Sequence, residues 1–484
     1  MSNELNLELS SLLRKFIFGA CVALLAPQVY GQEAKVLLKG RYLEFQGGFT
    51  IPEIGGLGSP TMIWSELQMD KLPGTSKWAF SHPAGYVVEL LEPGPIGTGD
   101  VKTWPELAVG RSQLVYTGID HLSTLGVFWL DAETLLTSVR RTYRAGPMDD
   151  WISKVDLDTG VVARYTVSAP YDANLQQFEV DNENFHVIQT LGSGFMRIND
   201  PVFSEAVANG NAFLMGRGGY DVLGSPRGPG LGSWNIGDTT ATMLIDYPNE
   251  SPLRRDRYFT FPSLDPSTNT EAAQPSLWSD PTAEGGDWVA GDIGGVAHIN
   301  HPEVKGVLFT VNDARGLLDY RAQGDGGSGK YFLVADPAKF YSADSEGTNR
   351  QNHEEETLNQ AYPPGGYARI GMVYDPDSLV RVANGELNPW DLDPLRFDWP
   401  QGDFEFADYE GHLTRLNVGE LGGAYWDNDR QLLWVTVSWP KPAKLVAYSL
   451  VVDDARPEPK VVIPAGYGDE VPPAPPQNVN IEGQ

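Results

Sequence analysis

The sequence predicts an all-β fold, a β-propeller of about five blades, with six or seven blades left open. The first observation is that apolar runs recur in one order: a glycine-led run, a polar turn, and two further runs. Two stretches show it, 422–426 with 432–437 and 444–450, and 294–299 with 307–311 and 367–375. The second observation is composition. The 484 residues include 53 Gly and 36 Pro, and 20% are charged, which favours many short strands joined by turns.

The expected blades follow one another along the chain. The strands of the first three are expected at 61–67, 78–81, 86–91 and 113–117; at 125–130, 135–140, 151–157 and 163–167; and at 195–198, 212–216, 242–246 and 258–261. The fourth blade begins at Gly294, with 395–399 as its outer strand, and the fifth begins at Gly422. Residues 36–49 have no blade of their own. We expect them to pair with the last blade and close the ring, which removes two exposed sheet edges.

Several segments interrupt the strand pattern. Residues 312–365 form a long insertion within the fourth blade, and residues 217–237 are rich in Gly and Pro. Residues 469–484 are a Pro-rich tail or linker, because such a composition does not pack as a blade. A short helix is expected at 378–384. The propeller domain is therefore expected to span residues 32–468.

Residues 1–31 resemble a secretory signal peptide. Arg14 and Lys15 precede an apolar stretch at 16–26 that is too short to span a bilayer, and small residues follow before Gly31. We therefore expect a secreted or periplasmic protein with no integral membrane segment after cleavage. A lipid anchor on Cys21 is disfavoured, because the apolar stretch continues beyond it. Cys21 is the only cysteine, so a mature chain would contain no disulfide.

The net charge of −29 restricts the classes of partner. A strongly negative protein repels nucleic acid and anionic lipid, so neither is expected to bind. The charge accounts for solubility, and it is also compatible with binding of cations or neutral sugars.

Part of the chain resembles a family of exported bacterial β-propeller-like proteins without an assigned activity. The segments that carry the resemblance are 125–129, 294–297, 374–379, 384–390 and 422–425. The resemblance implies a propeller and carries over no functional residue. The architecture is also similar to that of propeller glycoside hydrolases and polysaccharide lyases. Their catalytic motifs are not found in this sequence, so that similarity concerns the fold alone.

Two motifs have simpler structural interpretations than functional ones. Residues 324–330 match most of a phosphate-binding loop, but Tyr331 stands where a Ser or Thr would bind magnesium. His298 and His301 would lie on opposite faces of a strand, so no metal site is expected there.

The segment Asp156, Asp158, Gly160 has the spacing of a calcium loop but lacks the downstream acidic ligand. A hairpin turn explains the same residues. We therefore expect no cofactor and no metal, with calcium left as an alternative.

The catalytic residues are unknown, with His121, Arg141 and Tyr143 as candidates. A lyase needs a base and a cation that neutralises the substrate carboxylate.

The expected ligand-binding residues are Trp288, Asp313, Arg315, Trp439 and His412. Loop tryptophans, Trp234 included, suit the faces of pyranose rings. In a propeller, the loops that enter inner strands and the loops that follow second strands share one face. We therefore expect the binding face to be formed by residues 118–124, 140–150, 285–293, 312–365, 403–420 and 438–442.

Because no strong catalytic motif is present, the sequence predicts a binding protein for an extracellular glycan or another cell-surface ligand, held at the mouth of the channel. The alternative is a carbohydrate-active enzyme, either a polysaccharide lyase or a glycoside hydrolase. A second alternative is an adhesive or structural extracellular module. The sequence leaves the ligand and the oligomeric state open.

Overall fold

The structure is a computed structural model. It describes residues 35–52, 68–82, 85–116, 122–141, 151–167, 194–216, 229–245, 276–279, 291–314, 316–318, 330–333, 336–342, 367–389, 391–400, 421–437 and 442–459. The chain divides into two units, residues 1–36 and 37–484. Only residues 35 and 36 of the first unit are described, and all strands from β2 onward belong to the second.

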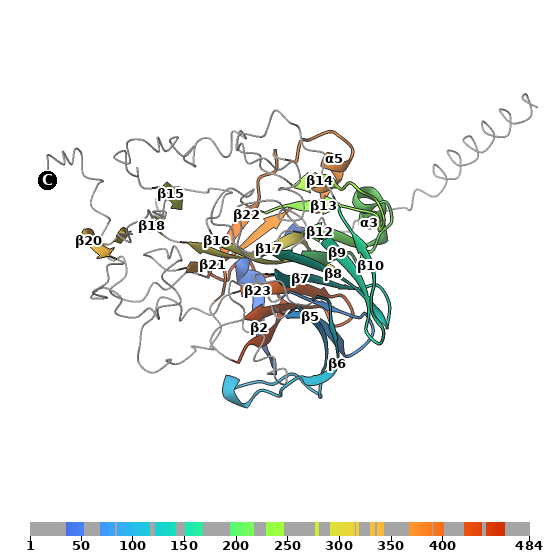
Figure 1. The fold of residues 1–484 in the computed structure, drawn as a ribbon. Helices are drawn as coiled ribbons and strands as arrows, with labels where there is room; N and C mark the ends of the chain where they lie inside the picture. The colour runs from blue at the N-terminus through green and yellow to red at the C-terminus, as the bar shows by residue number, and fades with distance from the viewer. Residues whose placement is uncertain are drawn as a thin grey trace, which may run out of the picture. The chain divides into compact units, whose positions relative to one another are not determined.

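The second unit is a β-propeller made of five antiparallel blades. The first contains β3 (Met69–Lys71), β4 (Lys77–His82), β5 (Tyr86–Leu91) and β6 (Ala108–Leu114). The second contains β7 (Leu122–Trp129), β8 (Thr134–Arg141), β9 (Trp151–Asp156) and β10 (Gly160–Tyr165). Figure 1 shows the strands of the second blade side by side.

The remaining blades follow the same order. The third contains β11 (Gly194–Arg197), β12 (Phe213–Gly216), β13 (Leu231–Ser233) and β14 (Thr242–Ile245). The fourth contains β16 (Gly291–Asn300), β17 (Val304–Ala314), β21 (Tyr367–Tyr374) and β22 (Leu395–Asp398), and β1 (Val36–Leu37) adds to β17. The fifth contains β23 (Leu421–Asp427), β24 (Leu432–Val437), β25 (Lys444–Leu450) and the N-terminal β2 (Leu43–Thr50).

The ring is closed by the N-terminal strand, as the sequence predicts. β2 runs antiparallel to β25, from Leu43 opposite Leu450 to Thr50 opposite Lys444. Each inner strand, β3, β7, β11, β16 and β23, contacts the next, and β23 contacts β3. Closure places the first and last strands of the unit in one sheet, where β25 is paired on both sides and β2 becomes the outer strand of the fifth blade.

Strand alternation supplies the core between blades. Leu445 and Ala447 of β25 pack with residues of the first blade, whereas Val446 and Tyr448 pack with residues of the fourth. Successive side chains of a strand point to opposite faces, so each blade covers both of its neighbours. The described core accordingly forms five clusters, one at each junction of consecutive blades.

The glycines at the start of the inner strands allow a close backbone approach. A Cβ on Gly294 would lie against the Leu421 carbonyl oxygen and 2.7 Å from that of Gly422. Thr310 of β17 donates from Oγ1 to the Gly422 carbonyl at 2.7 Å. The fourth and fifth blades therefore meet at their inner strands through backbone rather than side chains.

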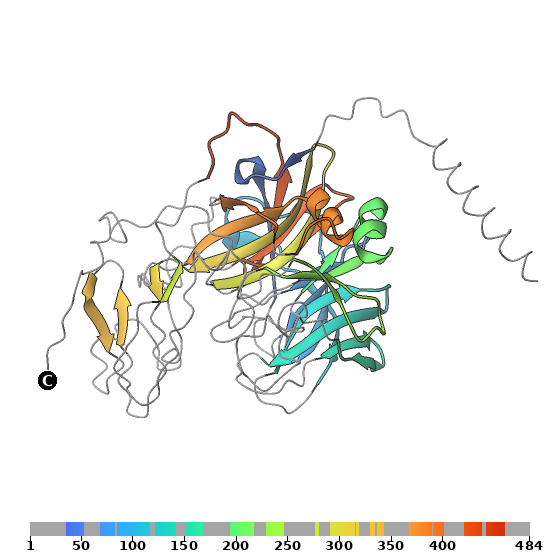
Figure 2. The same ribbon diagram turned by 90° about the horizontal axis from the view of Figure 1, so that it is seen from above.

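Two α-helices among the described residues connect strands. α5 (Pro376–Ala383) was expected, and its N-cap Asp375 accepts a hydrogen bond from the Asp377 amide. α3 (Pro201–Ala208) is capped in the same way by Asp200 and was not expected, because eight residues show little periodicity. Figure 2 shows the green α3 beside the orange α5. Two short 3-10 turns, η1 (Gly40–Tyr42) and η2 (Val101–Thr103), complete the described helical elements.

Three strand predictions were wrong. The inner strand of the first blade is Met69–Lys71, and the predicted 61–67 lies outside the described residues. Its outer strand is Ala108–Leu114 rather than 113–117. In the third blade, Leu231–Ser233 is the third strand, although the 217–237 segment looked like a break, and Thr242–Ile245 is therefore the fourth. A three-residue strand that contains Gly gives almost no alternation signal.

Strands of the long insertion take part in two small sheets, one of them with a strand that precedes the fourth blade. β18 (Gly316–Leu318) pairs with β15 (Ser276–Ser279), and β19 (Lys330–Leu333) pairs with β20 (Asp336–Ser342). In the chain, the insertion follows β17 and precedes β21, the second and third strands of the fourth blade.

We predict that Gly294→Ala lowers the free energy of unfolding by about 1–3 kcal/mol, because the new Cβ forces two backbones apart. Gly94→Ala is the matched control, since its Cβ would meet no atom within 4 Å. The control should change stability by less than about 0.5 kcal/mol. Urea unfolding of both variants measures the difference. Equal stability of the two would contradict the close approach of these strands.

Candidate functional site

The sequence-predicted site residues fall mostly outside the described residues. This holds for His121, Tyr143, Trp288, Arg315, His412 and Trp439. Arg141 and Asp313 are placed by their backbones only. Arg141 ends β8 opposite Leu122, and Asp313 lies near the end of β17 opposite Gly291.

These two residues occupy equivalent positions in two blades. Each lies where a second strand ends and an inner strand begins, and we call this side of the ring the entry end. The opposite side, where inner strands end, is the exit end. The register therefore places the backbones of Arg141 and Asp313 at the entry end and leaves the direction of their side chains open.

The described part of the channel is crossed by side chains. Gln68, which directly precedes β3 of the first blade, donates from Nε2 to the Gly294 carbonyl of the fourth blade. These blades are not neighbours in the ring, so the contact spans the axis. Gln68 is only 4% exposed. Its amide therefore fills the channel at the level of the inner-strand glycines.

A buried ion pair crosses the axis closer to the exit end. Arg197 of β11 donates from Nε to Asp70 Oδ1 of β3 at 3.0 Å, and its NH2 group contacts Asp70 Oδ2. The same guanidinium donates to the Trp129 carbonyl at 2.9 Å, and the Trp129 amide donates to Asp70 at 2.8 Å. First, second and third blades are thereby joined through one carboxylate.

The electrostatics of this pair favour its charged form. Burial by itself lowers the pKa of Arg197, but the Asp70 carboxylate outweighs burial and raises it. The guanidinium also lies over the Phe128 ring, 4.1 Å from its centroid. Tyr425 lies nearby, and burial together with Asp70 raises the pKa of its phenol, which keeps it neutral.

A third contact joins two further non-neighbouring blades. Asn199, which follows β11, donates from Nδ2 to the Trp426 carbonyl of β23 at 3.3 Å. We call Gln68, Asp70, Arg197 and Asn199 the axial cluster. Its members hydrogen-bond to one another or to backbone, so the cluster closes the channel as a set of internally satisfied polar groups.

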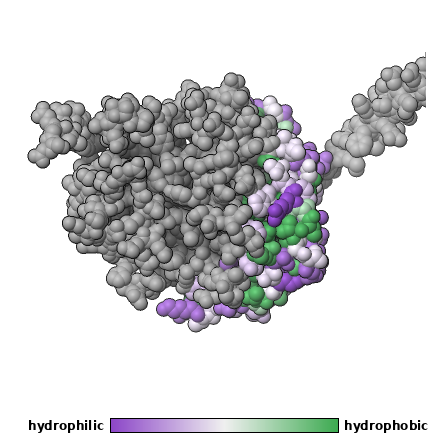
Figure 3. Space-filling view, viewed as in Figure 1, coloured by the Kyte–Doolittle hydropathy of each residue, from purple (hydrophilic) through white to green (hydrophobic). Residues whose placement is uncertain are grey.

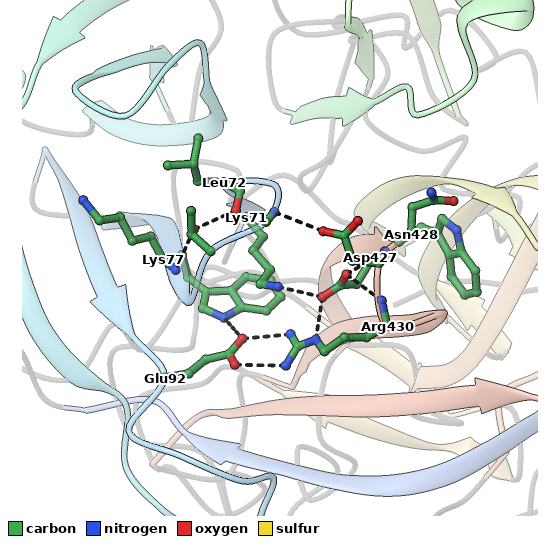
Figure 4. A network of polar contacts seen from close by, with 12 residues as sticks. Lys71, Leu72, Lys77, Glu92, Asp427, Asn428 and Arg430 are labelled. Carbon is green, nitrogen blue, oxygen red and sulfur yellow. Dashed lines mark hydrogen bonds and ion pairs between the residues drawn. The ribbon is translucent and has the colours of Figure 1, made fainter.

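A second polar network joins the last blade to the first (Figure 4). Lys71 Nζ lies 2.8 Å from Asp427 Oδ2, and Arg430 Nε lies 2.7 Å from the same oxygen. Arg430 also holds Glu92 through both guanidinium NH groups, at 2.9 and 2.8 Å. Burial alone raises the pKa of Asp427, but the hydrogen bonds from Lys71 and Arg430 hold it below its usual range.

The sequence did not reveal either group of residues. Asp70 and Lys71 lie outside the inner strand predicted at 61–67, so the sequence offered no reason to expect them at the axis. Arg197 ended a correctly predicted strand. An arginine within an otherwise apolar inner strand is the one signal that could have indicated a buried partner.

One tryptophan prediction was wrong. Trp234 was expected to be available for sugar stacking, but it is 2% exposed and packs against Tyr165 and Phe213. Its Nε1 donates to the Asp238 carbonyl at 2.8 Å. The residue follows β13, the strand that the sequence did not reveal, and it therefore belongs to the core between the second and third blades.

The two candidate metal motifs have structural explanations. His298 is buried and stacks on Phe203, with centroids 4.5 Å apart, whereas His301 accepts a hydrogen bond from the Glu303 amide. Asp156 caps its hairpin turn, accepting from the Asp158 and Thr159 amides at 3.0 and 2.8 Å. Among the described residues, no three His, Cys, Asp or Glu side chains are grouped to hold a metal ion.

The exposed large hydrophobic residues of the described surface include Val109 on β6, Val162 on β10 and Val202 on α3. Figure 3 shows hydrophilic and hydrophobic residues interspersed on the described part of one face. No described helix is long and apolar enough to cross a membrane.

We predict that Arg197→Met costs about 3–5 kcal/mol of unfolding free energy, because it leaves Asp70 buried without its cation. The control is Arg381→Met, which removes an exposed ion pair with Glu386 on α5. Such exposed pairs contribute about 0–1 kcal/mol. Chemical denaturation of both variants measures their free energies of unfolding. If both variants lose a similarly small amount of unfolding free energy, the pair of Asp70 and Arg197 is solvated rather than buried.

Comparison with known proteins adds no family. No family model and no curated protein matches the chain. Solved structures similar to it include the β-propeller domain of Cps50 (Swd1) from Myceliophteria thermophila, with 10% identity and a TM-score of 0.24 over 80% of this chain and 97% of that one. A glucose dehydrogenase has 10% identity and a TM-score of 0.27, covering 81% and 99%. The PQQ domain of a pyranose dehydrogenase from Coprinopsis cinerea has 11% identity and a TM-score of 0.26, covering 85% and 98%. These similarities are too distant to inform function, and the propeller assignment rests on the chain's own strand pairing.

Proposed function

We propose that the protein binds an extracellular glycan or another cell-surface ligand at the entry end of the propeller, without covalent chemistry. The observation that carries the proposal is the axial cluster. Gln68, Asp70 and Arg197 fill the channel, so a ligand cannot pass through and would be held at one end. A closed ring with a filled axis is a rigid support for loops, and binding residues are commonly placed on such loops.

The entry end is favoured over the exit end for a physical reason. At the exit end, described carboxylates are already engaged within the fold, since Asp427 accepts a hydrogen bond from Arg430 and Asp375 caps α5. At the entry end, the second strand of the fourth blade leads into the long insertion, and long insertions in compact folds are often functional.

The ligand class follows from charge and side-chain type. A net charge of −29 disfavours sulfated or uronate-rich glycans and favours neutral or amine-bearing ones. Trp288 and Trp439 would supply aromatic faces for pyranose rings, and Asp313, Arg315 and His412 would supply polar contacts to hydroxyl groups. The leader-like residues 1–31 support a secreted or periplasmic location.

We expect the protein to bind neutral or amine-bearing glycans on an array and to leave them intact. Trp288→Ala and Trp439→Ala should each raise the Kd by up to about tenfold, because this factor corresponds to the binding free energy of one aromatic contact. Titration calorimetry with the best array ligand measures the loss. Arg381→Ala is the control, because Arg381 lies on α5 at the exit end and is half-exposed.

Three other outcomes would contradict the proposal in different ways. Equal losses for the control and the tryptophan variants would place the site elsewhere. Release of reducing ends or unsaturated uronates that His121→Ala or Tyr143→Phe abolishes would show an enzyme. An array without any bound glycan would favour an adhesive or structural module.

A further inference from the structure

Lys444 is a buried lysine at the entry end. It is the first residue of β25, opposite Val437 where the second strand of the fifth blade ends, and opposite Thr50 of the ring-closing strand. Only 5% of its surface is exposed. By strand alternation its side chain lies on the face of Val446 and Tyr448, which pack toward the fourth blade.

The ammonium group of Lys444 has no counter-ion among the described carboxylates. Its Nζ donates to Thr50 Oγ1 at 2.6 Å, and this hydroxyl is fixed because Thr50 is hydrogen-bonded through its backbone to Pro105 and Leu107. The charged group that acts on it is Glu106, whose side chain is exposed and forms no ion pair with Nζ. β24 contributes only the apolar Val437 at this level.

Lys71 provides the contrast within the same chain. It is 4% exposed, as buried as Lys444, but its Nζ is paired with Asp427 at 2.8 Å. A buried cation without a partner favours its neutral form, whereas a paired one keeps its charge. For Lys444, burial lowers the pKa to about 8, against the weaker opposing effect of Glu106.

We propose that Lys444 is a nucleophilic amine that takes small aldehydes as a reversible imine. The Nζ lone pair attacks the carbonyl carbon, the C=O π bond opens, and a proton passes from the nitrogen to the oxygen to give a neutral carbinolamine. Loss of water then forms the C=N bond, and no oxidant or reductant is needed. Thr50 Oγ1 can accept an N–H of both the amine and the carbinolamine, which orients the lone pair away from the hydroxyl. The small exposed fraction restricts the substrate to small aldehydes.

The test is reductive methylation of the full-length protein with formaldehyde and cyanoborohydride, followed by peptide mass spectrometry. At about pH 7.5, about a quarter of an amine with a pKa of about 8 is unprotonated, against about one part in a thousand for an ordinary lysine. We therefore expect the Lys444 modification rate to rise with pH to a midpoint near 8. The equally buried Lys71 should stay unmodified at that pH.

Two results would overturn the proposal. One is a midpoint near pH 10 for Lys444, which would show an ordinary ammonium. The other is an unmodified Lys444 under conditions that fully modify the exposed Lys102, which would show an amine that no aldehyde reaches. The readout does not depend on glycan binding, so it stands or falls separately from the proposed function.

Lys444→Met gives an independent measurement on a variant that keeps the aliphatic packing. A lysine whose pKa is lowered on folding makes the stability of the protein depend on pH. Above the unfolded pKa, near 10.4, the amine is neutral in both states. Between about pH 10.4 and about 8, the unfolded state binds a proton that the folded state does not, so the folded state loses stability as the pH falls. Relative to the wild type, the variant should therefore gain melting temperature as the pH is lowered from 10 to 7. A difference that does not change with pH would contradict an uncompensated Lys444.

Discussion

The structure depends on closing a ring of sheets. Each blade is apolar on both faces, so it is stable only when a neighbour covers each face. In a row, the two terminal blades would each expose one such face, together with an unpaired edge. Pairing β2 with β25 puts strands from opposite ends of the unit into one sheet, and the five interblade clusters then form a continuous core.

Closure also decides where charges can be buried. At the axis, inner strands from all five blades come close, and side chains from non-neighbouring blades reach one another. Asp70 and Arg197 pair there with backbone partners on both sides, so neither charge is left unsatisfied. Such a pair adds little net stability over apolar packing, but losing one member is costly. The Lys71–Asp427–Arg430–Glu92 network applies the same rule at the junction of the last blade with the first.

Lys444 departs from that rule. It is as buried as Lys71, yet it lies at the last rung of the closing ladder, where the exposed Glu106 is the described acid that acts on it. The carboxylates described at the axis and the exit end are paired, as Asp70, Asp427 and Asp375 are, whereas the amine of Lys444 at the entry end has no counter-ion among the described residues.

The sequence by itself determined the propeller, the fourth and fifth blades, the ring closure and the helix α5. Those elements have long alternating strands, glycine pairs or an Asp-Pro cap, and such signals are local. It failed where a strand was as short as Leu231–Ser233, because three residues carry no period. Only the tertiary structure decided that Trp234 is core, that Gln68 spans the channel, and that Asp70 meets Arg197. Closure of the ring brings together Asp70 and Arg197, which are 127 residues apart in the sequence. A local sequence pattern cannot predict a contact between residues so far apart in the chain.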